Sequence, residues 1–208
     1  MEGIGLIAFF AGQSNLNFML SFFPRCDKEF FSRDVLEVAP ELLGCFFVRQ
    51  SETGILRCRI TEVEAYRGEE DRACHACKGR TARTEIMYHE GGHLYVYLIY
   101  GMYWMLNIVT GPVDQPQAAL IRGIEGFYGP GRLTRYMGID KSFYGENLLI
   151  SNRLWLEKAP AMSSYEKLPR IGIEYAGEPW KSKRWRFTAQ QPGKTHSAGD
   201  KMPGLSIL

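Results

Sequence analysis

The chain has 208 residues, a formal net charge of +2 and a hydrophobic fraction of 45%. These values are typical of a globular protein with one sizeable domain, and so small a net charge neither requires nor excludes a nucleic-acid partner. No stretch approaches the roughly 20 apolar residues of a membrane span. Five cysteines do not suggest a disulfide framework, and Cys74 and Cys77 form a single C-x-x-C, which is too little for a structural zinc site. We therefore expect an intracellular protein that does not associate with membranes.

The two ends of the chain differ from its middle. Residues 1–24 are mostly apolar, but they carry the acidic Glu2 near their start and lack the pattern of a signal peptide, so we expect a flexible N-terminal extension. Residues 191–208 contain Pro, Gly and polar residues, and we expect a flexible C-terminal tail. Residues 25–190 are then expected to form a single folded domain.

Apolar periodicity and turn residues predict mostly strands in this domain. A helix is expected over Asp34–Leu43, interrupted near Pro40 and stopped by Gly44. A short helix is expected in "YGPGRLTRYMG". The expected strands are "CFFVR", Ile55–Tyr66, Tyr95–Tyr100, "QAALIRGIE", "LLISNRLWLEK", "PRIGIEYAG" and "KRWRFTAQ". Short turns join successive strands, so we expect an α+β fold with one mostly antiparallel, curved sheet and a few packed helices.

The strand Ile55–Tyr66 alternates between apolar and polar residues in its first half. Continuing this parity places Glu62, Glu64 and Tyr66 on the apolar side. Buried carboxylates are costly unless they are paired or hydrogen-bonded, so the alternative is a bulge that turns both glutamates to water. We favour the solvent-facing alternative for Glu62 and the inward position for Glu64.

The stretch "MYHEGGHLYVY" contains H-E-x-x-H, the pattern of a zinc-protease helix. Its two middle residues are glycines, and each costs about 1 kcal/mol relative to alanine inside a helix. Aromatic and β-branched residues follow, which favours a turn that enters a strand. A zinc hydrolase built on His89, Glu90 and His93 is therefore a minor alternative, and we expect neither a metal nor a cofactor.

Four blocks in chain order, "TEVEAYRGEEDRACHA", "LYVYLIYGMYWMLN", "ALIR" and "GPGRLTR", resemble the alkyladenine (3-methyladenine) DNA glycosylase family. The resemblance runs from about Phe31 to about Thr188. It implies a DNA-associated enzyme that removes alkylated or deaminated purines from double-stranded DNA in base excision repair. Such an enzyme must evert the target nucleotide, which costs a few kcal/mol of stacking and pairing. We expect it to act as a monomer.

The resemblance also implies which residues contact the DNA. Tyr100 would intercalate into the duplex, with Met102 and Tyr103 beside it in the groove. The residues that would bind the everted base are Tyr66, His75, Tyr97 and Asn107. Stacking on aromatic side chains gives about 1–3 kcal/mol per base, and electron-rich rings attract the positive charge of alkylated purines.

Glu64 is the expected general base. A carboxylate can deprotonate the attacking water and stabilise the oxocarbenium-like sugar. Arg122, embedded in an apolar strand, is expected to offset the burial of this charge, and by resemblance it belongs to the catalytic site. No lysine is evident beside Glu64, so we expect a monofunctional glycosylase without lyase activity.

Phosphate contacts are predicted where the chain offers positive charge and unpaired backbone N–H groups. The start of the helix at Gly131, with Arg132 and Arg135, fits this description, although a plain helix cap fits it equally well. Weaker candidates are Lys183, Arg184 and Arg186. A nucleic-acid-binding module without catalysis remains the alternative function, and the sequence does not predict the preferred lesion.

Overall fold

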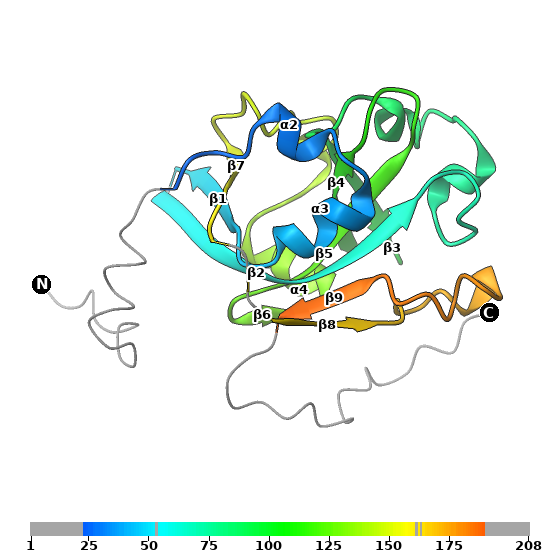
Figure 1. Cartoon of the computed structure of the whole chain (residues 1–208). Coiled ribbons are helices and arrows are strands. Elements are labelled where there is room, and N and C mark those ends of the chain that lie inside the picture. The colour runs from blue at the N-terminus through cyan, green and yellow to red at the C-terminus, as the bar shows by residue number, and fades with distance from the viewer. Residues whose placement is uncertain (1–22, 53, 161, 163, 190–208) are drawn as a thin grey trace, which may run out of the picture.

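The computed structural model describes residues 23–52, 54–160, 162 and 164–189 (Figure 1). The expected C-terminal tail lies outside the described residues, as do residues 1–22 of the expected N-terminal extension. The helices of the described part are α2 (Lys28–Phe31), α3 (Val35–Leu42) and α4 (Pro130–Tyr136). Its strands are β1 (Phe46–Ser51), β2 (Gly54–Arg67), β3 (Leu94–Ile99), β4 (Tyr103–Thr110), β5 (Gln117–Ile124), β6 (Phe127–Tyr128), β7 (Leu154–Glu157), β8 (Tyr165–Leu168) and β9 (Arg186–Ala189). Short 3₁₀ helices occupy His75–Lys78, Glu85–Tyr88, Lys141–Phe143 and Glu174–Ala176.

The strands form one curved antiparallel sheet with the order β3-β4-β5-β2-β1-β7. The long strand β2 connects its two parts: the first half pairs with β1, and the second half pairs with β5 and β9. The helices α2 and α3 lie over one part of the sheet (Figure 1), and α3 packs on β2 and β5 while α4 packs on β4 and β5. This confirms the expected α+β fold with a mostly antiparallel, curved sheet.

A bulge in β2 corrects the parity argument for its second half. The pairing of β2 with β5 shifts register on either side of Glu62. Ile60 and Val63 both lie in the main hydrophobic core although they differ in parity. Before the bulge, even-numbered residues of β2 face the main hydrophobic core, and after it odd-numbered residues do. Glu64 therefore points to the face of the sheet opposite this core. The expectation that Glu62 faces water was wrong, because its side chain is only 15% exposed and is ion-paired with arginines.

The segment "PRIGIEYAG" was expected to be a strand and is not one. Arg170 donates to the buried Asp71 and the backbone N–H of Ile171 donates to Glu64, so the segment is held by carboxylates of β2 and the loop after it rather than by a strand ladder. Strands β4, β6 and β8 and the helix α2 were not expected. The helix α3 begins after its N-cap Asp34, as predicted, and continues through Pro40 instead of breaking there.

The H-E-x-x-H stretch forms a turn that leads into β3, as predicted. A Cβ on Gly91 would lie 2.1 Å from the carbonyl oxygen of Phe31, so close packing against α2 requires glycine there. The rings of His89 and His93 lie 5.6 Å apart between centroids. Within the described ranges, no three His, Cys, Asp or Glu side chains are grouped as metal ligands, and no helix there is long and apolar enough to cross a bilayer.

Candidate active site

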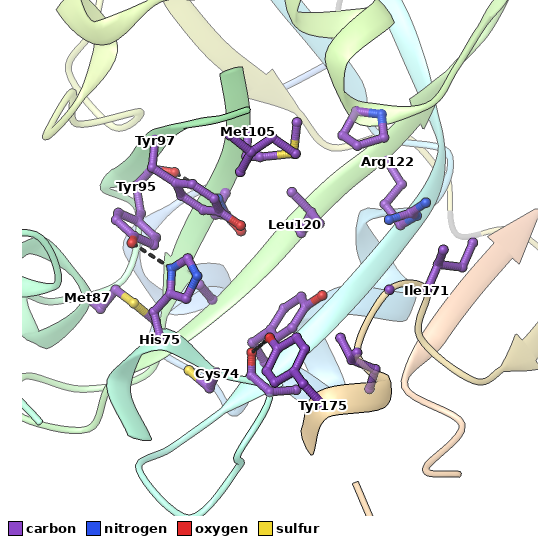
Figure 2. A pocket seen from close by; sticks show the side chains of 18 of the residues that line it. Cys74, His75, Met87, Tyr95, Tyr97, Met105, Leu120, Arg122, Ile171 and Tyr175 are labelled. Atoms are coloured by element: carbon purple, nitrogen blue, oxygen red, sulfur yellow. Dashed lines mark hydrogen bonds between the residues drawn. The ribbon is translucent and has the colours of Figure 1, made fainter. Parts of the chain in front are cut away.

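A cavity of about 250 Å³ is lined by residues of β2, β3, β4 and β5, by the loop at 73–75 and by the segment 171–175. Figure 2 shows Tyr95, Tyr97 and His75 on one side of it and Arg122 and Ile171 on the other. Its size lies just below the roughly 300–1,000 Å³ range of pockets for drug-sized ligands, so it suits a ligand as small as a single base. The aromatic residues that line it are Tyr66, His75, Tyr95, Tyr97, Tyr100 and Tyr175.

His75, Tyr95 and Tyr97 form one aromatic wall. The His75 ring lies 4.7 Å from the Tyr97 ring between centroids, and the Tyr95 and Tyr97 rings lie 5.0 Å apart. His75 Nδ1 is hydrogen-bonded to the Tyr95 hydroxyl at 2.8 Å, which fixes the orientation of the imidazole. Successive residues of a strand point to opposite faces, and Tyr95 and Tyr97, two apart on β3, therefore face the cavity together.

His75 is uncharged at neutral pH. Burial is the main reason that its pKa falls to about 4, and the positive charges of Arg83 and Lys78 lower it further. A neutral imidazole does not repel a positively charged ring placed next to it, whereas a protonated imidazole would repel that ring.

Asn107, the fourth residue expected to bind a base, also lines the cavity. Its side-chain Nδ2 donates to the backbone carbonyl of Tyr95 at 2.9 Å, and the residue is only 3% exposed. This bond holds the amide across the β3–β4 ladder, where the two residues are direct partners. The structure thus brings Tyr66, His75, Tyr97 and Asn107 together around one cavity.

Glu64 is completely buried directly behind this cavity. Its Oε1 accepts the backbone N–H of Ile171 at 2.8 Å, and its Oε2 accepts the Tyr66 hydroxyl at 2.8 Å and Arg122 Nη1 at 3.4 Å. All three donors belong to residues that line the cavity, while Glu64 itself does not. A single layer of hydrogen-bond donors therefore separates the carboxylate from the cavity.

The environment of Glu64 favours its protonated form more than water does. Burial raises the pKa of the carboxyl, and the charge of Arg122, the N–H of Ile171 and the Tyr66 hydroxyl only partly oppose this. Arg122 is shared, because its Nε also binds Glu62 at 3.1 Å. A carboxylate whose pKa lies above its ordinary value is a stronger base, which suits general-base chemistry near neutral pH.

Tyr100 stands at the tip of the β3–β4 hairpin in a strained conformation. Its φ is 51°, a left-handed value that costs a non-glycine residue about 1–2 kcal/mol, and Gly101 follows with φ of 67°. The turn is closed by a bond from Met102 N to Ile99 O at 3.1 Å. Tyr100 is 62% exposed and Met102 is 60% exposed. The hairpin therefore projects two large apolar side chains into solvent at the edge of the cavity.

Tyr103 lies at the start of β4 and packs against α4. A Cβ on Gly131 would lie 2.6 Å from the Tyr103 ring, so this glycine permits the close approach of the helix. The Arg135 guanidinium lies 6.0 Å from the centre of the same ring, and Arg132 is exposed. Gly131 thus has a packing reason to be glycine that is independent of any phosphate.

The basic residues before and in β9 have different surroundings. Lys183 Nζ lies 4.0 Å from the centre of the Trp180 ring and 4.2 Å from that of Trp185. Arg186 is partly buried, and it binds Glu62 at 3.1 Å and the carbonyl of Pro169 at 2.8 Å. Arg184 is exposed.

Several cavity residues were not identified from the sequence. They include Tyr95, Met105, Leu120, Ile171, Ile173 and Tyr175. Tyr175 is 69% exposed, yet its hydroxyl donates to the backbone carbonyl of Ala73 at 3.2 Å, which holds the ring at the cavity. The glycines on both sides of this residue in "RIGIEYAG" favour a turn over a strand, and this signal could have identified the segment as a loop.

The chain matches the profile of a known family along nearly all of its described length. Residues 29–128 and 127–192 match the family described as methylpurine-DNA glycosylase (MPG). The chain belongs to this family. Its members are DNA glycosylases, enzymes that hydrolyse N-glycosyl bonds, so the family confirms the resemblance drawn from the sequence and the enzyme class that it implied.

Curated relatives of the methylpurine-DNA glycosylase family agree with this assignment. A protein of Methanocella arvoryzae is 43% identical over 184 residues, which cover 79% of this chain and 92% of the relative. A protein of Natranaerobius thermophilus is 40% identical over 187 residues, covering 78% and 94%. A protein of Psychrobacter cryohalolentis is 41% identical over 185 residues, covering 74% and 86%. All three carry the name "Putative 3-methyladenine DNA glycosylase".

Proposed function

We propose that the protein is a monofunctional glycosylase that everts a damaged purine from duplex DNA into the cavity and hydrolyses its bond to the sugar. The observation that carries this proposal is the position of Glu64, which lies one hydrogen-bond layer behind a cavity walled by aromatic residues. The 3-methyladenine named for the relatives is a purine of the proposed substrate class.

The aromatic wall provides stacking contacts for a flat base. In this proposal, the base stacks among Tyr66, His75 and Tyr97, and Asn107 lies beside it. Each stacking contact is worth about 1–3 kcal/mol. The face of a tyrosine ring attracts positive charge, and His75 adds none of its own because its pKa is about 4. A purine made cationic by alkylation is therefore bound more tightly than an ordinary base.

The β3–β4 hairpin supplies the wedge. Tyr100 is held in a strained turn with its ring in solvent, and a rigid apolar side chain can fill the gap left by an everted nucleotide. Met102 and Tyr103 flank it, and the arginines of α4, Arg132 and Arg135, are the proposed phosphate contacts. Intercalation offsets part of the few kcal/mol lost when the base leaves the stack.

Glu64 is the proposed general base of the reaction. In the proposed reaction, a water oxygen attacks the sugar C1′, the bond from C1′ to the purine nitrogen breaks with its electrons leaving on the base, and Glu64 takes a proton from the water. The water must displace one of the three donors on the carboxylate, and the contact with Arg122 is the longest, at 3.4 Å. Arg122 then orients the water, and the negative charge of Glu64 stabilises the positive sugar.

Base release tests the proposal directly. Duplexes that contain 3-methyladenine, 7-methylguanine, hypoxanthine or ethenoadenine are incubated with wild type and with Glu64→Gln under single-turnover conditions. We expect release of at least one lesion by wild type and a loss of about 10²–10⁴-fold in rate for Glu64→Gln, with binding retained. A non-catalytic binding module instead predicts that neither protein releases a base, and equal rates for the two proteins would remove Glu64 from the mechanism.

A further inference from the structure

Asp71 and Arg170 form an ion pair that is completely buried next to the cavity. Both side chains are 0% exposed, and they lie 99 residues apart in the sequence. The two guanidinium nitrogens Nη1 and Nη2 each donate to one carboxylate oxygen, Nη2 to Oδ1 at 2.9 Å. This two-bond arrangement fixes both the distance and the relative orientation of the two segments that carry the residues.

Arg170 contacts the surroundings of Glu64 from one side. Its Nη1 donates to the backbone carbonyl of Ala65 at 3.0 Å, and its guanidinium lies 4.8 Å from the centre of the Tyr66 ring. The next residue, Ile171, donates its backbone N–H to Glu64. Two of the three donors on Glu64, Tyr66 and Ile171, are therefore held in place by Arg170.

Asp71 organises the loop that carries the opposite wall. Its carboxylate accepts the backbone N–H of Ala73 at 3.1 Å and that of Arg67 at 3.2 Å. Its backbone carbonyl accepts the N–H of Cys74 at 2.8 Å. These bonds shape the turn immediately before His75, so the loop with the imidazole starts from Asp71.

We propose that the Asp71–Arg170 pair is the positioning element that aligns the catalytic carboxylate of Glu64 with the base-binding wall around His75. This inference rests on the proposed function of the cavity. Neither residue reaches the cavity itself, so both are positioning residues rather than catalytic ones. A buried ion pair adds little net stability over apolar packing, whereas a bidentate pair specifies geometry, and here it ties the segment 170–175 to the loop 71–75.

Two substitutions test the pair. Asp71→Asn keeps the shape of the side chain and removes its charge, and Arg170→Lys keeps the charge but removes the two-bond geometry. The control is Glu157→Gln, which removes the charge from another buried ion pair, with Arg57, outside the cavity lining. Each variant is measured for the single-turnover rate of base release with saturating enzyme, its pH profile and its thermal unfolding. Duplex affinity is measured in the Glu64→Gln background, where the lesion stays intact.

We expect Asp71→Asn and Arg170→Lys each to lower the rate by about 10- to 100-fold, since misplacement by about 1 Å can cost 100-fold. The affinity for lesion duplex should change less than the rate. The groups facing Glu64, namely Arg122, Glu62 and Tyr66, remain in both variants, while the Ile171 N–H that lowers its pKa is loosened. The acid limb of the pH profile should therefore move to higher pH, and Glu157→Gln should move neither rate nor profile.

The possible results separate the proposed function from the positioning role of the Asp71–Arg170 pair. A wild type that releases no base from any of the lesion duplexes overturns the proposed function and this inference together. An active wild type, with either variant folded and equal to it in rate and pH profile, overturns the positioning role alone. A variant that loses rate only in proportion to its loss of folded protein also overturns it. A slower, folded variant with a shifted acid limb supports it.

Discussion

Glu64 and Glu157 are buried carboxylates in two parts of the same sheet, and they differ in how their charge is balanced. Both Nε and Nη2 of Arg57 lie 2.8 Å from one oxygen of Glu157, whose side chain is 6% exposed. Glu64 exposes nothing, and its arginine lies 3.4 Å away and is shared with Glu62. The charge of Glu157 is thus balanced by a close arginine, whereas Glu64 shares its more distant arginine with Glu62.

This difference separates a structural carboxylate from the proposed catalytic one. Burial raises the pKa of Glu64 because its partners do not compensate fully. A buried charge that its partners do not fully balance destabilises the fold, but its raised pKa suits proton transfer. Groups with such perturbed pKa values are common at functional sites. The half of β2 that pairs with β1 serves the scaffold, and the half after the bulge serves the proposed chemistry.

The largest difference between Glu64 and Glu157 is expected in how their substitution changes the free energy of unfolding. Glu64 has a raised pKa in the folded state, so above its ordinary value of 4.5 the folded chain holds a proton more tightly than the unfolded chain does. Stability is therefore lost as the pH rises from that value through the folded pKa. We expect Glu64→Gln to stabilise the protein at neutral pH, with the gain shrinking as the pH falls through the folded pKa toward 4.5, and Glu157→Gln to destabilise it by about 3–5 kcal/mol.

Urea unfolding at pH 7 and pH 4 measures both effects. The wild-type curve at each pH is the control, and the slope of the transition shows whether the two-state description holds. A loss of stability at pH 7 in both variants would mean that Glu64 is as well compensated as Glu157, and the contrast between them would disappear.

Arg122→Gln should sharpen the contrast by removing the partial counter-ion. The charge of Arg122 lowers the pKa of Glu64, so without it the pKa rises further and the base is protonated at higher pH. We expect the acid limb of the pH–rate profile to move to higher pH and the rate at neutral pH to fall by about 100-fold. The matched variant Arg57→Gln, which removes the counter-ion of Glu157, should unfold more easily without moving the limb. An unmoved limb in Arg122→Gln would contradict the assignment.

Tyr100→Asn tests the hairpin, which serves binding rather than proton transfer. Asparagine tolerates the left-handed conformation better than tyrosine, so thermal stability should stay the same or increase. The affinity for a lesion duplex, measured by titration in the Glu64→Gln background, should fall by about tenfold, because the wedge is lost. Leu98→Asn, at another exposed apolar side chain on the preceding strand, is the comparison. Unchanged affinity in Tyr100→Asn would exclude this residue as the wedge.

Tyr66→Phe should have the smallest effect. It keeps the stacking ring and removes only the hydroxyl that donates to Glu64, a bond that lowers the pKa of the carboxyl. We expect a small movement of the acid limb to higher pH, in the same direction as for Arg122→Gln, and an unchanged affinity for lesion duplex. A movement to lower pH would show that the hydroxyl does not stabilise the ionised form.

The sequence predicted the elements with strong periodicity, and it missed those held by tertiary contacts. The helix after Asp34 and strands such as β3, β5 and β9 follow from local pattern and caps. The segment 170–175 contains apolar residues at strand spacing, but its backbone and its arginine bind carboxylates about 100 residues away. No local signal encodes such partners. Strand β4 was not expected, although it directly follows the tight turn at Gly101 that closes the β3–β4 hairpin.

The site was predicted in part by residue type and in part by resemblance. The alternation along β2 indicated two glutamates of unusual placement, but their true side depends on a bulge that becomes visible only in the pairing with β5. The proposed base-binding residues do surround one cavity. Asp71 lies within the block "TEVEAYRGEEDRACHA" that carries the resemblance, but no role was expected for it, and Arg170, an arginine after a proline, resembles an ordinary surface residue in the sequence.

The low pKa of His75 has a consequence for the conditions under which the cavity can work. With a pKa of about 4, the imidazole keeps the same charge throughout the pH range of living cells. Acid stress would thus leave the charge of His75 unaltered, and in the proposed mechanism the hydrolytic step would respond through Glu64. If the proposed mechanism holds, acidification of the cell would slow excision of the base while leaving His75 able to bind it uncharged.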